Sequence, residues 1–579
     1  SPSTNWQLEI AGEVVSDLGK VAEHFNTFFN TAAEKLLHHT KTQRSGVAQL
    51  NNSFQGETLT NWPLASHEEV LTIVSSLKST SSVGIDGVSS KMIKFCINEI
   101  SKPLTNIINK SLFQGEFPTK LKTSKVYPLL KNGSKQEVQN YRPISLVPTI
   151  SKIIEKIVLA RLLEHLNLNN LLPERQHGFI SGKSTTSALI DLIEHTIDNL
   201  EKGHTVTSVF LDLSKAFDSL DHRLIIQKIK SLGFEGSTLK WFQSYLSKRY
   251  QIVEIKQVQL GAERTVRSKP QMVKRGVPQG SVLGPVLFVL FTSDLPKYLE
   301  SHCYPVMFAD DTVLLTGSKS SELLDINTYI AVSMAQQYCD SNDLVFNSSK
   351  TKLLALGRLK DELTEPPDLQ RVVTTKHLGV ILDECLSWRC HIDGLCSRLN
   401  SAVFALKRIK AVATPTATKT AYHAIFESHL RYGIILWGGS TMENLERVLI
   451  AQKRAVRVMA GLQPRDSCRE AFKSLRILTV VSIYIIEVIN YAASRGNLPR
   501  LSAVHDHHTR RGNDFSLPIH RTALFSKKPC YAGAKLFNLL PQDFKNCDPK
   551  TLKRRLLDWL KDKSIYSLDE FKTSMNNFH

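Results

Sequence analysis

The sequence lacks any uninterrupted run of about 18 or more apolar residues, which is the length that a transmembrane helix needs. We therefore expect no membrane-spanning helix and no membrane partner. Cysteine is also scarce, because nine residues, an odd number, are scattered singly over 579 positions. This usage argues against a disulfide framework and favours reduced thiols, so we expect an intracellular protein of the nucleus and cytoplasm.

Acidic residues are the third shortage, because 54 Asp and Glu face 73 Lys and Arg, giving a formal charge of +19. The excess of cations favours a polyanionic partner such as nucleic acid, although a membrane surface or solubility alone would also account for it. The hydrophobic content of 42% is that of a folded globular chain. The chain begins with Ser1 rather than Met, so we expect it to be part of a longer polypeptide.

Two apolar runs, residues 304–308 and 312–315, flank the acidic pair Asp310-Asp311. Such runs around a short polar break predict a β-hairpin with the carboxylates at its turn. A second strand-like run, residues 208–211, ends in Asp212. Buried strands that end in acids are unfavourable unless a cation binds there, and two Mg²⁺ ions about 3.5–4 Å apart are typical of phosphoryl-transfer sites. For Asp310-Asp311 alone, a solvated hairpin turn is the alternative.

A Gly- and Pro-rich loop, residues 275–285, lies between the two acidic runs. With it, three motifs occur in a fixed order: Asp-Leu-Ser-Lys-Ala-Phe-Asp at 212–218, Gly-Val-Pro-Gln-Gly-Ser at 276–281 and Phe-Ala-Asp-Asp at 308–311. Together they resemble the palm motifs of reverse transcriptases, and more narrowly those of non-LTR (LINE-type) retrotransposons of the jockey-like branch. The resemblance covers about residues 66–460.

This resemblance implies an α+β right-hand polymerase, with fingers, palm and thumb and with helical N- and C-terminal extensions. The implied activity is that of an RNA-directed DNA polymerase, which extends a DNA primer 3′-OH with dNTPs on an RNA template. In the family a nick in target DNA supplies the primer 3′-OH. Copying of RNA from such a primer is called target-primed reverse transcription. The implied cofactor is a pair of Mg²⁺ ions, with Mn²⁺ as a substitute. The oligomeric state stays open.

The same resemblance assigns catalytic roles to four residues. Asp212, Asp310 and Asp311 would bind the metal ions, and Asp310 is expected to be a direct ligand because neighbouring side chains on a strand point to opposite faces. The element at residues 347–351 is similar to the family's Asn-x-x-Lys-Thr motif. Lys350 in this element would protonate the leaving pyrophosphate as a general acid.

Five further residues are assigned to the substrates. A basic hairpin over residues 125–146 resembles the family's fingers, so Lys131 and Arg142 would contact the triphosphate, whose oxygens suit a planar Arg fork. Phe217 would exclude a ribose 2′-OH by steric clash and so select dNTPs. Gln279 and Gly280 would lie at the nascent base pair, where a glycine lets the backbone approach closely. Exposed hairpin charges and plain core packing are the alternatives for Lys131, Arg142 and Phe217.

Hydrophobic periodicity predicts the remaining organisation. Apolar residues at helical spacing predict an amphipathic helix over 10–38, followed by a polar linker over 41–64. We expect four units: an N-terminal helical extension and linker at 1–65, fingers and palm at 66–385, a basic helical thumb at 386–462, and a basic C-terminal domain at 463–579. The last of these is expected to include a helix at 548–563.

Three other site patterns are disfavoured. Gly178 and Gly182 enclose three residues, whereas a P-loop needs four, so we expect no ATPase. The spacing of Cys385, Cys390, His391 and Cys396 fits no compact zinc motif. A polar loop is the preferred interpretation of residues 505–508, His-Asp-His-His, over a metal site.

Two functional alternatives stay open. A group II intron-like maturase would share the polymerase motifs but would also carry a distinct maturation region, which we do not recognise. A domesticated, catalytically silent RNA-binding protein would have lost the acidic residues, which are intact here.

Overall fold

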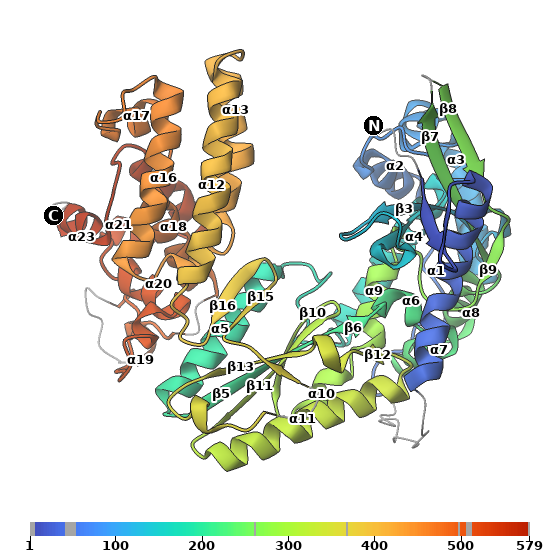
Figure 1. The fold of residues 1–579 in the computed structure, drawn as a ribbon, viewed down its shortest axis with the longest axis horizontal. Coiled ribbons are helices and arrows are strands. Elements are labelled where there is room, and N and C mark those ends of the chain that lie inside the picture. The colour runs from blue at the N-terminus through green and yellow to red at the C-terminus, as the bar shows by residue number, and fades with distance from the viewer. Residues whose placement is uncertain are drawn as a thin grey trace.

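The computed structural model describes residues 6–40, 54–259, 262–365, 369–495, 498–504 and 512–576. Helices and sheets are mixed along the chain, so the expected α+β class is confirmed. Figure 1 shows a central sheet from which two groups of elements rise, one built from the N-terminal half and one from the C-terminal helices. Within the described ranges, no helix has the length and apolar character to cross a membrane.

The central sheet has the strand order β10-β11-β5-β13-β14. These strands are β5 (Thr205–Leu211), β10 (Tyr304–Phe308), β11 (Asp311–Ser318), β13 (Lys352–Leu356) and β14 (Gln370–Arg371). Every residue of β5 is buried, and β5 pairs antiparallel with both β11 and β13. Helices α5 (Thr185–Glu201) and α11 (Ser321–Ser341) cover opposite faces, because alternate residues of β5 join different hydrophobic clusters.

A second sheet has the order β4-β3-β7-β8, with β9 also paired to β7. Its strands are β3 (Thr123–Leu130), β4 (Tyr141–Leu146), β7 (Arg249–Gln259), β8 (Ala262–Arg267) and β9 (Gln271–Val273). The expected basic hairpin is the antiparallel β3–β4 pair. Eight helices share a hydrophobic cluster with α11 and one face of β5: α2 (His67–Ser76), α3 (Ser90–Gln114), α4 (Thr149–Leu168), α6 (Ala216–Ser219), α7 (His222–Ser231), α8 (Gly236–Leu246), α9 (Gly284–Phe291) and α10 (Leu295–Leu299).

The N-terminal region differs from its prediction in two places. The first residues of the expected helix form a small hairpin, β1 (Leu8–Ile10) and β2 (Glu13–Val15), and α1 begins only at Leu18 and runs to Thr40. A tight turn at Ala11 and Gly12, both with positive φ, separates the strands. The described part of the expected linker, residues 54–64, is mostly exposed but is anchored by Trp62, which is 4% exposed and lies against Phe234 and two further aromatic rings.

The C-terminal third is helical, as expected. It contains α12 (Arg389–Lys410), α13 (Pro415–Tyr422), α14 (Ser428–Arg431), α15 (Ile434–Trp437), α16 (Met442–Ala460), α17 (Arg469–Ser474), α18 (Val480–Arg495), α19 (Leu501–Val504), α20 (Pro529–Phe537), α21 (Gln542–Lys545), α22 (Pro549–Lys561) and α23 (Leu568–Asn576). The last expected helix corresponds to α22, whose Leu552, Leu556 and Leu560 are buried as one stripe. One hydrophobic cluster contains residues from both α16 and α18, so the core continues across the boundary expected at residue 462.

Candidate active site

Strand register brings the three predicted carboxylates to one end of the central sheet. Leu211 pairs with Thr312, so Asp212 and Asp311 leave adjacent strands at the same level. Phe308 pairs with Asp311, which leaves a two-residue turn, Ala309-Asp310, at the tip of the β10–β11 hairpin. The hairpin and the turn position of Asp310 are therefore as predicted, whereas Asp311 is the first residue of β11.

The charges of these carboxylates interact. Burial and the negative charge of Asp212 raise the pKa of Asp310 above its usual range. For Asp311, burial and the charges of Asp310 and Asp212 raise the pKa to about 6. The positive charges of Lys131 and Arg142 oppose the rise at Asp310. The basic hairpin is therefore within electrostatic reach of the acidic turn.

The donor set fits a divalent metal ion in its chemistry. Mg²⁺ prefers carboxylate oxygens, and mutual repulsion among neighbouring carboxylates is relieved when a cation binds. In the described part of the chain, no three His, Cys, Asp or Glu side chains are grouped closely enough to hold a metal ion as they stand. The case for a metal ion therefore rests on the negative charge of the carboxylates and on their common position at one end of the sheet. The side chains would have to move closer together to bind the ion.

The basic hairpin presents Lys131 and Arg142 as exposed side chains. Arg142 lies in β4 opposite Leu129 of β3, and the main-chain N–H of Lys131 donates to the carbonyl of Asn140, which holds the far end of the hairpin together. Both cations are therefore carried by a hydrogen-bonded ladder rather than by a loose loop.

The Gly- and Pro-rich loop is fixed to α6 on one side and to β4 on the other. Gln279 donates from Nε2 to Asp218 Oδ1 at 2.7 Å, and its carbonyl accepts from the N–H of Ser145 in β4 at 2.8 Å. A Cβ at Gly280, whose φ is +134°, would lie 2.3 Å from the Ser145 carbonyl oxygen. The requirement for glycine thus comes from contact with β4 inside the fold.

Phe217 is partly buried between two other aromatic rings. Its ring stacks on Phe288 with centroids 4.6 Å apart, and Phe179 meets it edge-on at 6.4 Å. Core packing therefore accounts for one face of the ring. The remaining exposure leaves room for a second role toward a substrate.

Lys350 is exposed in a short 3₁₀ turn, Ser348–Lys350, beside the strand end that carries Asp212. The N–H of Asn347 donates to the Asp212 carbonyl at 3.0 Å, and Thr351 Oγ1 accepts from the Asp212 N–H at 3.4 Å. The structure thus brings the predicted general acid into the neighbourhood of the carboxylates.

Glu155 of α4 is a site-supporting residue that the sequence analysis missed. It is fully buried, and its Oε2 accepts from the N–H groups of Val282 and Leu283 at 2.7 and 3.1 Å, while Ser151 donates to its Oε1. Glu155 thereby caps the start of α9 and holds the preceding loop. The sequence does contain a sign of this role, because Glu155 follows Ile154 and precedes further apolar residues of the same helix. An acid on a buried helix face needs hydrogen-bond partners.

The zinc pattern that the sequence disfavours, residues 385–396, spans the start of α12. Cys385 and Cys390 are exposed, and His391 is buried at 2% between Trp388 and Trp437. Residues 505–508 lie outside the described residues. Lys183, from the segment that resembled a P-loop, donates to the main-chain carbonyls of Glu174 and Gln176 and so acts as a tether within the fold.

Comparison with known proteins identifies relatives of this chain. Residues 130–382 match the family model described as "Reverse transcriptase (RNA-dependent DNA polymerase)". The chain is 30% identical over 412 residues to the "Probable RNA-directed DNA polymerase from transposon BS" of Drosophila melanogaster, an alignment that covers 68% of this chain and 44% of that protein.

Two further relatives come from the same fly. Identity to the "RNA-directed DNA polymerase from mobile element jockey" is 25% over 465 residues, which is 78% of this chain and 49% of the relative. Identity to the "Probable RNA-directed DNA polymerase from transposon X-element" is 25%, with coverage of 88% and 54%. The chain therefore spans about half the length of the curated relatives it matches.

Among solved structures, the apo telomerase from Candida Tropicalis aligns with 68% of this chain and 67% of its own. Its TM-score of 0.35 at 12% identity is too low to support an argument.

Proposed function

This chain carries a reverse transcriptase domain of the jockey-like, non-LTR retrotransposon type, and from this premise we propose that it is an RNA-directed DNA polymerase. Its substrates would be an RNA template, a DNA primer and dNTPs. In the reaction the primer 3′-oxygen forms a bond to the α-phosphorus of the dNTP, and pyrophosphate leaves. The biological primer would be a nick in target DNA, and we propose that the chain works in the nucleus and cytoplasm.

One observation carries this proposal: Asp212, Asp310 and Asp311 share one end of a buried sheet, opposite the cations Lys131 and Arg142. Two Mg²⁺ ions held by these carboxylates would lower the pKa of the primer 3′-OH and neutralise charge on the triphosphate. A site with both signs of charge suits a reaction between a metal-activated hydroxyl and a polyphosphate.

The residues around the carboxylates would bind and orient the substrates. Arg142 and Lys131 would grip the phosphate oxygens of the dNTP, and their approach is fixed by the β3–β4 ladder. The free face of Phe217 would lie under the sugar and reject a 2′-OH. Gln279, which donates a hydrogen bond to Asp218, would contact and position the templating base. Lys350 would deliver a proton to pyrophosphate.

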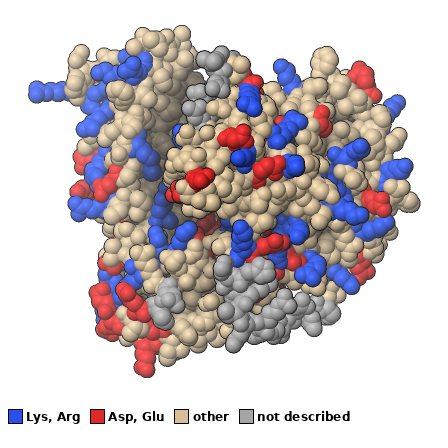
Figure 2. All heavy atoms as spheres, turned by 45° about the vertical axis from the view of Figure 1, so that its right-hand side comes forward, with Lys and Arg blue, Asp and Glu red and all other residues tan. Residues whose placement is uncertain are grey.

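We propose the following division of the chain: an N-terminal extension at 1–65, fingers and palm at 66–385, thumb at 386–462 and a C-terminal domain at 463–579. The central sheet would be the palm and the β3–β4 sheet part of the fingers. Figure 2 shows Lys and Arg side chains gathered along a hollow on one face of the molecule. Such a strip suits the phosphate backbone of a template–primer duplex.

Primer extension tests this proposal. The chain is incubated with a labelled DNA primer annealed to an RNA template, with Mg²⁺ and either all four dNTPs or all four rNTPs. The expected result is cDNA whose length follows the template and whose formation requires dNTPs. Binding of the duplex without any extension would contradict the polymerase and favour the silent RNA-binding alternative.

A further inference from the structure

A short segment directly supports the turn that carries Asp310. The side chain of Gln176 is completely buried, and its Oε1 accepts hydrogen bonds from two N–H groups, those of Gly178 and Ala309, both at 2.8 Å. Its Nε2 donates to the carbonyl of Ala309 at 3.5 Å. One carboxamide thus engages both polar main-chain groups of the residue before Asp310.

The supported turn has an unfavourable backbone conformation. Ala309 has φ +55°, a left-handed value that costs energy for a residue with a side chain. Gly178 packs against it so closely that an added Cβ would lie 2.4 Å from the Ala309 nitrogen. The conformation of Ala309 sets the direction in which the next residue leaves the hairpin, so the contacts that stabilise it also aim Asp310.

The segment that carries Gln176 is itself hydrogen-bonded to β10. The N–H of His177 donates to the Met307 carbonyl at 2.7 Å, and the N–H of Met307 donates to the Arg175 carbonyl at 2.9 Å. Residues 175–177 therefore run parallel to β10 at this point, where Gln176 and Met307 form a single β-bridge.

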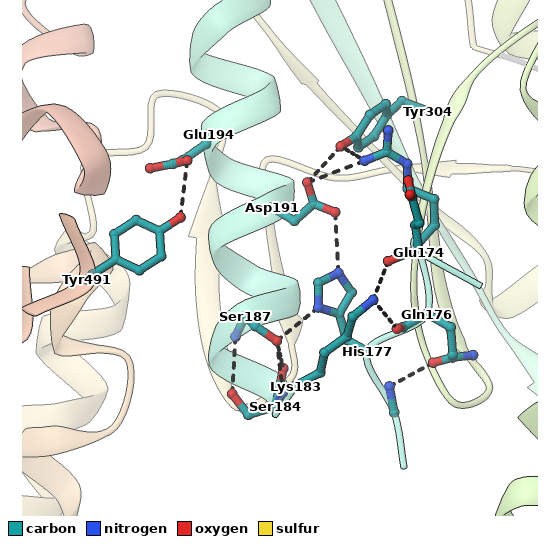
Figure 3. A network of polar contacts seen from close by, with 12 residues as sticks. Glu174, Gln176, His177, Lys183, Ser184, Ser187, Asp191, Glu194, Tyr304 and Tyr491 are labelled. Atoms are coloured by element: carbon teal, nitrogen blue, oxygen red, sulfur yellow. Dashed lines mark hydrogen bonds and ion pairs between the residues drawn. The ribbon is translucent and has the colours of Figure 1, made fainter. Parts of the chain in front are cut away.

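A polar network on α5 fixes the other side of the segment. The ring of His177 hydrogen-bonds with Ser187 Oγ at 2.9 Å and with Asp191 Oδ2 at 3.3 Å. Lys183 donates to the carbonyl of Gln176 at 2.9 Å. Figure 3 shows the His177 ring directed at Ser187 and Asp191 of α5, Lys183 directed at the main chain of Gln176, and the carboxamide of Gln176 pointing away from that helix.

We propose that Gln176 is a positioning residue for the metal-binding turn: it holds the Ala309–Asp310 peptide so that the Asp310 carboxylate is aimed at the divalent cation. The proposal rests on the proposed function, because it concerns the same metal site. Residues that orient metal ligands by hydrogen bonding change metal affinity or activity by about 10–100-fold when they are replaced.

The test compares Gln176→Met with a matched control, Gln452→Met. Gln452 is also completely buried and makes three hydrogen bonds, to the Tyr422 hydroxyl, the Leu478 carbonyl and the Val480 N–H, but it lies in α16. Both changes remove a buried carboxamide of the same size. A purely structural role would therefore affect the two variants alike.

Two readouts separate the roles. Mn²⁺ binding to the chain without nucleic acid is measured by electron paramagnetic resonance, and the Mg²⁺ concentration for half-maximal primer extension is measured separately. Thermal unfolding without metal reports folding. We expect Gln176→Met to weaken Mn²⁺ binding about tenfold or more and to raise the Mg²⁺ requirement similarly. Gln452→Met should lower the unfolding temperature but leave both metal readouts at native values.

A folded Gln176→Met variant with native Mn²⁺ binding would overturn the proposal, and so would equal metal effects in both variants. If Gln176→Met does not fold, Gly178→Ala takes its place, because it pushes on the Ala309 nitrogen without removing a hydrogen bond. Native Mn²⁺ binding in that variant would count equally against the proposal. If the native chain extends no primer, the polymerase proposal fails, while the Mn²⁺ comparison still decides the role of Gln176.

Discussion

Replacing Asp311 by Asn should stabilise the metal-free chain while it abolishes the proposed polymerase activity. Burial and the neighbouring charges of Asp310 and Asp212 raise the pKa of Asp311 from 3.8 to about 6. The folded chain therefore binds a proton at this site more tightly than the unfolded chain does. At neutral pH the carboxyl is ionised in both states, and the folded state bears the cost of the repelled charge.

The size of the effect follows from that pKa. For a group shielded from water, a rise from 3.8 to about 6 corresponds to roughly 3 kcal/mol at pH values above 6. The shielding of Asp311 is only partial, because its side chain also keeps contact with solvent; solvent screening therefore reduces the cost, and we expect about 1 kcal/mol. In a chain of this size such a change moves the unfolding temperature by about 1–2 °C.

The assay is thermal unfolding in EDTA at several pH values, with Asp569→Asn as the control, since it removes only an exposed ion pair to Lys572. The stability of the native chain relative to Asp311→Asn should fall as the pH rises from about 4 to about 6.5, and it should stay constant below that window. Saturating Mg²⁺ should remove the advantage of the variant, because the ion stabilises the native carboxylates. An Asp311→Asn variant that is less stable than the native chain in EDTA at pH 7.5 would refute the reasoning.

Further predictions concern the residues around the carboxylates. Phe217→Val should raise rNTP incorporation relative to dNTP incorporation in single-nucleotide assays, and an unchanged ratio would leave the ring with only its packing on Phe288. Arg142→Ala should raise the dNTP KM about tenfold or more through loss of a charge-assisted hydrogen bond, with kcat changed less; an unaltered KM would argue against phosphate contact. Lys350→Ala should lower kcat by about 10²-fold or more while duplex affinity persists. Glu155→Ala should cost about 2–4 kcal/mol of stability, because two buried N–H groups lose their acceptor, and a native-like unfolding temperature would count against that role.

The core of the site could be predicted from the sequence because its signals are local. Apolar runs that end in Asp212 and Asp310 specify strands and a hairpin, and antiparallel pairing then places the acids together. The α+β class and the reverse transcriptase relationship followed from motifs in the same region. These features depend on period-two patterning and on residue spacing, which the sequence displays directly.

What the sequence could not display is the support around the site. Nothing in the sequence indicates the positive φ of Ala309, because alanine ordinarily favours helices. The hydrogen bond from Ala309 to Gln176 joins residues about 130 positions apart, so no local pattern predicts it. Trp62 lies in a stretch of polar sequence, and the aromatic rings that pack on it belong to residues 234–242, far away along the chain. At the N-terminus, the alternation in β1 and β2 is only three residues long in each strand, too short to compete with the helical pattern that follows.

The central claim is that the acidic turn of the β10–β11 hairpin catalyses template-directed DNA synthesis. The most direct measurement compares primer extension on an RNA template by the native chain, Asp310→Asn and the control Asp569→Asn, at equal duplex occupancy. We predict robust extension by the native chain and the control, and loss of extension in Asp310→Asn with duplex binding retained. Extension by Asp310→Asn at the native rate would contradict the account.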